Sequence, residues 1–151
     1  MIQRKQTLYL LGALILNSLL FFFPLVTFLI ENNVFELRFS GIVFTEGEAI
    51  VEAPSILAFQ ILLVLSVLVT LVTIFLFKKR HLQIRLSVFN AIAMLGLPIL
   101  IFYFKTWGIV ADTSSLGFVS ILPLVSTILT FAGVKNIIKD EALVRSYDRI
   151  R

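Results

Sequence analysis

The sequence predicts an all-α membrane protein in which four transmembrane helices form one bundle, with a small β-rich extracytoplasmic loop and a cytoplasmic C-terminal helix. Of its 151 residues, 59% are hydrophobic and 15% are charged, and the mean hydropathy of +1.03 is too high for a soluble domain. The ionisable residues gather between four long apolar runs. The basic ones concentrate in alternate connections, as expected of a multi-pass protein. We therefore treat residues 1–151 as a single integral membrane domain.

Four apolar runs carry the predicted spans, over residues 7–30, 55–77, 86–104 and 116–134. Each is long enough, as a helix rising about 1.5 Å per residue, to cross a hydrocarbon core of about 30 Å. The first run is too long for a signal-peptide core, and no small-x-small cleavage pattern follows it. Pro24 predicts a kink or an early helix end within this run, because proline removes a backbone donor.

The distribution of charge predicts the orientation. Eleven of the 13 Lys and Arg lie before residue 7, between the second and third runs, or after residue 134, whereas six of the nine Asp and Glu lie in the other two connections. Because basic residues near span ends are retained in the cytoplasm, both chain ends and the turn 78–85 are predicted to be cytoplasmic. This asymmetry explains the net charge of +4 without nucleic acid as a partner.

The two outer connections differ in length. In the first, residues 31–54, apolar and polar residues alternate from Phe35 to Ser40, which is typical of a strand. Further strand-forming runs at 42–44 and 49–51 predict a small antiparallel hairpin or three-stranded sheet. The second connection is short, and Thr113 to Ser115 are predicted to begin the fourth helix.

The tail, residues 135–151, is predicted to be a cytoplasmic helix. It has a rough apolar stripe, and Glu141 stands four residues before Arg145, a spacing that supports helix. Acidic residues interleaved with basic ones suit contact with a protein, although orientation of the chain and attraction to anionic lipid also explain the basic residues. The candidate docking residues are Lys139, Asp140, Glu141, Arg145, Asp148 and Arg149.

Within the spans the sequence places no ionisable residue, which argues against an ion-coupled transporter. The larger polar residues are Asn17, Gln60 and Asn90, and we predict that they form hydrogen bonds between helices rather than a ligand site. With one histidine and no cysteine, no catalytic, cofactor or metal site can be proposed, and we do not expect an enzyme.

Three stretches resemble a known family: Met1 to Arg4, Leu82 to Arg85, and above all the tail sequence Lys139 to Ser146 followed by Asp148 to Arg151. The chain resembles an uncharacterised bacterial family of small four-span membrane proteins that is classed as a domain of unknown function. Tyr147 departs from the family, in which this position is often small. The resemblance implies a bacterial inner membrane and brings no activity or site residue.

From these observations we expect a non-enzymatic accessory or scaffold subunit of a bacterial inner-membrane complex. Its expected partners are the lipid bilayer and a membrane or cytoplasmic protein, docked through the tail or the outer loop, with the oligomeric state left open. The alternative is a small channel or lipid-handling transporter. A polar or hydrated face inside the bundle would favour that alternative.

Overall fold

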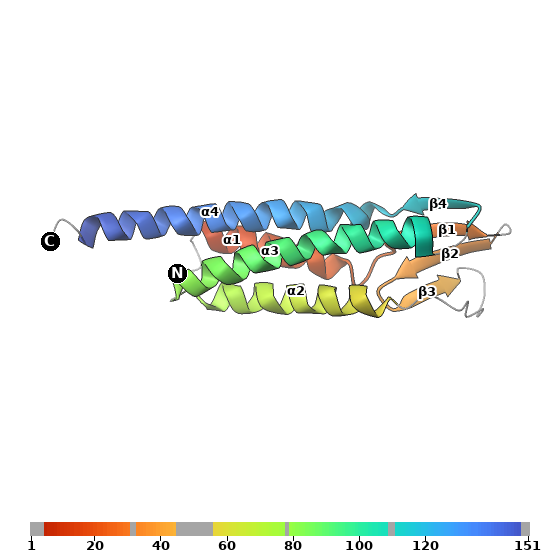
Figure 1. The fold of residues 1–151 in the computed structure, drawn as a ribbon, viewed down its shortest axis with the longest axis horizontal. Coiled ribbons are helices and arrows are strands. Elements are labelled where there is room, and N and C mark those ends of the chain that lie inside the picture. Colours follow the sequence, from red (N-terminus) through yellow and green to blue (C-terminus); the bar gives the residue numbers. More distant parts are fainter. Residues whose placement is uncertain (1–4, 31–32, 45–55, 78, 109–110, 149–151) are drawn as a thin grey trace.

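The computed structural model describes residues 5–30, 33–44, 56–77, 79–108 and 111–148. Helices and strands both contribute to the fold, in two separate parts of the molecule (Figure 1). In chain order the elements are α1 (Lys5–Leu19), β1 (Val26–Ile30), β2 (Asn33–Arg38), β3 (Gly41–Phe44), α2 (Leu57–Phe75), α3 (Arg80–Tyr103), the π-helix η1 (Phe104–Gly108), β4 (Thr113–Leu116), the 3-10 helix η2 (Phe118–Ile121) and α4 (Leu122–Asp148).

The α-helices form an elongated bundle. α1 packs on α2 and α4, and α3 packs on the same two helices, so α1 and α3 lie diagonally opposite each other. The sheet covers one end of the bundle, here called the sheet end; α1 begins and α4 ends at the opposite end, here called the terminal end (Figure 1). The described helices account for the predicted four-helix arrangement, although their lengths differ from the predicted ones.

A four-stranded antiparallel sheet forms the cap, in the order β3-β2-β1-β4. Phe28 of β1 lies opposite Phe35 of β2, and Val26 of β1 lies opposite Leu116 of β4. The strand predicted from Phe35 to Ser40 is confirmed as β2 as far as Arg38, and the strand-forming run at 42–44 is confirmed as part of β3. The run at 49–51 lies outside the described residues.

The prediction that residues 7–30 form one helix is wrong. α1 ends at Leu19, a turn follows, and the remainder of the apolar run becomes β1. Pro24 cannot continue a helix, and the β-branched and aromatic residues after it pair with a strand on each side. Three helices are long and apolar enough to cross a membrane, and the helix from Gln6 to Leu19 is a shorter apolar one.

The predicted start of the fourth helix is also wrong. Thr113 to Ser115 lie in β4, where hydrogen bonds to β1 replace those of a helical turn. The Gly117 amide donates to the Leu25 carbonyl at 2.8 Å, and α4 begins only at Leu122. Pro123 is therefore in the first turn of α4, where its missing N–H has no intrahelical partner to lose.

The remaining boundaries shift less. α3 begins at Arg80, so residues 80–85 of the predicted basic turn belong to the first part of this helix. The helix predicted for the tail is continuous with the fourth helix as far as Asp148. The predicted second helix, 55–77, contains all of α2.

A cluster of buried apolar side chains lies where the bundle meets the sheet. Phe28 and Leu37 from the sheet pack with Phe59 and Leu97 from the helices and with Leu20 from the turn after α1, and all five are almost completely inaccessible to solvent. Phe21 meets Phe39 edge to face, with ring centroids 4.6 Å apart. We call this cluster the apolar core; it fills the sheet end only.

Candidate functional site: a buried polar seam and a projecting helix

The interior of the bundle on the terminal side of the apolar core combines polar side chains with buried apolar ones, among them Leu10, Met94 and Ile137. Ser66, Thr70 and Thr73 share one face of α2, at spacings of four and three residues, and Gln83, Ser87 and Asn90 share one face of α3 in the same way. We call the whole set the polar seam. Its buried members are Gln6, Asn17, Ser66, Thr70, Thr73, Gln83, Ser87, Asn90, Ser126, Thr127 and Thr130.

The exterior of the same helices is apolar. Exposed positions of α2 and α3 carry side chains such as Leu68, Phe75, Phe89 and Ile99. Exposed helix faces of soluble domains are mostly polar or charged, so an apolar exterior over buried polar side chains is unusual for a soluble domain. Small polar residues at helix contacts are typical of helices that associate in a bilayer.

Asn90 connects α3 to α2. Its Nδ2 donates to the Thr70 hydroxyl at 2.7 Å and to the Ser66 carbonyl at 3.2 Å. Asn17 connects α1 to α4, because its Oδ1 accepts a hydrogen bond of 2.8 Å from the Ser126 hydroxyl. Ser126 also lies 3.6 Å from the Met94 sulfur on α3. The structure thus gives Asn17 and Asn90 different partners on different helices.

Gln60 lies outside the seam. Its Nε2 donates to the Phe39 carbonyl at 2.8 Å, which ties α2 to the turn after β2. The contact joins bundle to sheet rather than helix to helix. Of the three predicted polar residues, the structure therefore places Asn17 and Asn90 in the seam and Gln60 at the sheet.

Among the described residues, four buried polar atoms of the seam have no hydrogen-bond partner: Gln6 Oε1, Asn17 Nδ2, Gln83 Oε1 and Ser87 Oγ. Other seam hydroxyls bond to a carbonyl of the preceding turn, as Thr70 does to Ser66 at 2.8 Å. Ser87 does not. Leaving such a group buried and unpaired costs about 1–3 kcal/mol.

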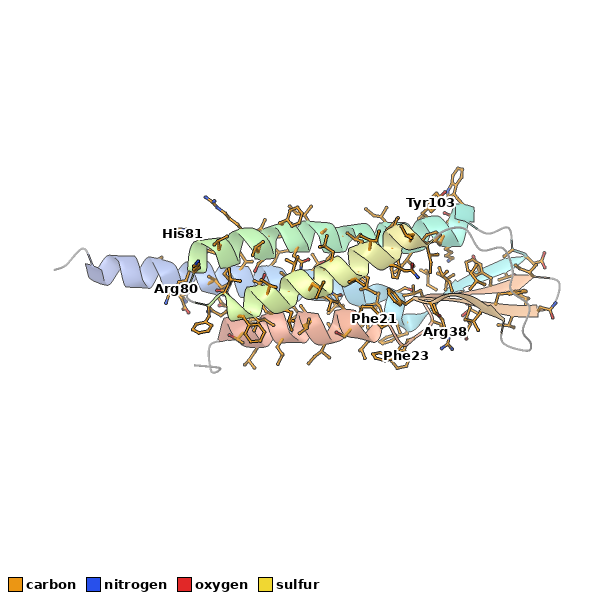
Figure 2. The ribbon with its side chains drawn as sticks, turned by 90° about the horizontal axis from the view of Figure 1, so that it is seen from below. Phe21, Phe23, Arg38, Arg80, His81 and Tyr103 are labelled. Atoms are coloured by element: carbon orange, nitrogen blue, oxygen red, sulfur yellow. The ribbon has the colours of Figure 1, made fainter. Side chains whose placement is uncertain are left out.

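The seam offers no catalytic chemistry of its own. Its members are Ser, Thr, Asn and Gln, with no base to activate a hydroxyl. Within the described ranges no group of three His, Asp or Glu could hold a metal ion. His81 is exposed on the first turn of α3, and Figure 2 places it beside Arg80, at the opposite end of the molecule from Arg38.

The last turns of α4, which carry several of the predicted docking residues, project beyond the bundle (Figure 1). Lys139 is exposed, and the Asp140 carbonyl accepts a hydrogen bond of 3.4 Å from Arg80 Nη1 at the start of α3. Glu141, Arg145 and Asp148 belong to the last turns of α4, and Arg149 lies outside the described residues. Residues 141–148 extend the helix about 12 Å past the Arg80 contact.

An apolar groove of about 480 Å³ opens on the side of the molecule near the sheet end. Pro98 and Phe102 of α3 form one wall, and Phe118 and Leu124 belong to the other. Ser120, the polar side chain in the lining, donates its hydroxyl to the Leu25 carbonyl. The described lining of the groove therefore has no side-chain hydrogen-bonding group left free to bind a polar ligand.

Several seam residues were missed by the sequence-based prediction. Gln6 follows Lys5, and Gln83 lies within the basic segment 78–85, so both look like solvated positions, and Ser87 looks like an isolated hydroxyl. The signal that could have found the α3 members is the spacing 83, 87, 90, which places them on one helical face.

Taken together, the described residues define a helical bundle with a buried polar seam, an apolar exterior and an antiparallel sheet at one end. The chain belongs to the family described as a domain of unknown function (DUF4293), whose model matches residues 2–150. The predicted resemblance to a family of this kind is confirmed. No curated protein and no solved structure matches the chain.

Proposed function

We propose that this chain is a multi-pass protein of the bacterial inner membrane. Three described helices are long and apolar enough to span, and their exteriors carry aliphatic and aromatic side chains. The terminal end holds the basic residues in the first two turns of α3 and those of α4, so the positive-inside rule favours a cytoplasmic location for it. The sheet end then lies outside.

Within that membrane the chain serves as a non-enzymatic accessory or scaffold subunit. The observation that carries this proposal is the projection of α4, which remains helical beyond the hydrogen bond between Arg80 and the Asp140 carbonyl and bears both acidic and basic residues. A rigid helix of mixed charge suits a protein surface of complementary pattern, whereas attraction to anionic lipid depends mainly on total basic charge.

Exchanging Glu141 and Arg145 tests the docking surface, because it preserves the net charge and reverses the pattern. We expect the exchanged protein to accumulate in the membrane at the parental level and to lose a protein that copurifies with the parent in mild detergent. Exchanging Glu36 and Arg38, a salt-bridged pair of β2 at the sheet end, is the matched control and should keep that partner. If the Glu141/Arg145 exchange keeps every partner, the docking hypothesis is wrong, and the basic residues of the tail serve only to orient the chain in the membrane.

Single cysteines test the orientation in this cysteine-free chain. Ser115 on β4 and Arg85 on α3 are both exposed and lie toward opposite ends of the molecule. Ser115→Cys should react with a membrane-impermeant thiol reagent in intact spheroplasts, and Arg85→Cys should react only after lysis. The opposite result would invert the topology.

The apolar groove favours a second candidate, a lipid-handling transporter, because a groove without polar groups accepts an acyl chain. Leu124→Trp would fill the groove, whereas Ile128→Trp, one turn along α4 and exposed, would not. If this candidate is correct, reconstituted protein accelerates transbilayer movement of a fluorescent phospholipid, and only Leu124→Trp abolishes it. Equal rates with and without protein would exclude it.

A further inference from the structure

The unpartnered atoms of the polar seam concentrate toward the terminal end. Gln6 lies in the first turn of α1 and Gln83 in the first turn of α3, and both side chains are almost completely buried. Because α1 and α3 are diagonally opposite in the bundle, buried side chains from both approach its axis. Ser87 follows Gln83 by one turn on the same face of α3.

The chemistry of these atoms indicates what can satisfy them. Gln6 Oε1 and Gln83 Oε1 are acceptors, Asn17 Nδ2 is a donor, and Ser87 Oγ can do both. Neighbouring seam donors are already engaged, since Gln83 Nε2 bonds to the Thr73 carbonyl at 3.1 Å and Asn90 Nδ2 bonds to Thr70. Water donates two hydrogen bonds and accepts two, and buried waters typically bond to such otherwise unpaired groups.

We propose that water enters the polar seam from the terminal end and hydrates it as far as Asn17. The inner part of the bundle is then an aqueous inlet lined by amide and hydroxyl groups. The inlet ends at the apolar core, where Leu20, Leu63 and Leu97 are fully buried, so it is not a through-path. This inference rests on the proposed membrane location, because a hydrated seam matters only where lipid surrounds the bundle.

The test uses water itself as the probe and needs the smallest possible changes. Since the chain has no cysteine, one introduced thiol gives a single S–H infrared band, which converts to S–D only where D2O reaches it. Ser87→Cys and Ala91→Cys report the inlet, and Leu97→Cys reports the apolar core. Phe89 lies between Ser87 and Ala91 along α3 but is 61% exposed on the exterior, so Phe89→Cys is the control for a thiol that faces lipid. Arg85→Cys, at an exposed position, is the control for a thiol in bulk water.

In proteoliposomes transferred to D2O, Ser87→Cys and Ala91→Cys should exchange on the order of tenfold faster than Phe89→Cys, because a thiol ionises readily only in contact with water. Leu97→Cys should exchange as slowly as Phe89→Cys. If both inlet thiols are as slow as Phe89→Cys, the inlet does not exist, and exchange at Ser87→Cys alone overturns its proposed depth. Fast exchange at Leu97→Cys would overturn the apolar closure.

The same series separates this inference from the proposed location. If Phe89→Cys exchanges as fast as Arg85→Cys, the exterior of α3 is in water and the membrane location itself is wrong. If Phe89→Cys is slow together with both inlet thiols, the location stands and only the inlet fails.

Discussion

The two ends of the bundle are held together by different interactions. At the sheet end, apolar side chains from the strands and from all four helices pack into one core, and backbone hydrogen bonds join strands from distant parts of the chain. At the terminal end, Asn, Ser and Thr side chains join neighbouring helices. Packing of large side chains contributes more free energy per residue than a buried polar contact, so the sheet end should be the more sensitive end.

The largest effect is expected at Phe28, which is fully buried between β2 and β4. Phe28→Ala should lower the free energy of unfolding by about 4 kcal/mol, because it removes the ring and leaves a cavity. Phe22→Ala is the control, since that ring is 72% exposed. Unfolding in mixed detergent micelles measures the free energy of unfolding of both variants. Equal losses for Phe28→Ala and Phe22→Ala would contradict the assignment of Phe28 to the apolar core.

A smaller loss in the free energy of unfolding is expected at Gly117, where the chain passes close to the segment that connects α1 to β1. A Cβ at this position would lie 2.4 Å from the Pro24 carbonyl oxygen, and this backbone atom cannot move independently. Gly117→Ala should therefore cost about 3 kcal/mol in the same unfolding assay.

The control for this substitution is Gly12→Ala in α1. The added Cβ would meet only a Leu129 methyl carbon at 3.4 Å, an ordinary contact. Because alanine favours helix over glycine by about 1 kcal/mol, this variant should be as stable as the parent or slightly more stable. A large loss in the free energy of unfolding for Gly12→Ala would show that α1 and α4 pack more tightly at this position than the structure indicates.

The smallest effects are expected within the polar seam. Thr70→Val removes the acceptor of the Asn90 hydrogen bond and should cost about 1 kcal/mol. Ser87→Ala removes a hydroxyl that has no protein partner and should cost less than Thr70→Val in the same assay. A larger loss at Ser87 would indicate a protein contact that the structure does not contain.

Periodicity predicted the elements whose pattern is local. The alternation around Phe35 and Leu37 predicted β2, and the apolar runs predicted α2 within two residues at each end and the end of α3 within one, although α3 begins six residues before its run. Asn17 and Asn90 were recognised because a large amide in an apolar run is conspicuous. Gln83 was missed because it lies in the basic segment 78–85, which looked like a solvated turn, and only the packing of α3 against α2 buries it.

The sequence by itself determined the apolar runs, the asymmetry of charge and the family, because these properties depend on composition and order along the chain. Only the tertiary structure decided that residues 26–30 are a strand, since their hydropathy suits a helix equally well. Pairing with β2 on one side and β4 on the other supplies backbone partners that a local pattern cannot reveal. Tertiary packing likewise decided which polar groups are buried together, because two faces become one seam only when their helices meet.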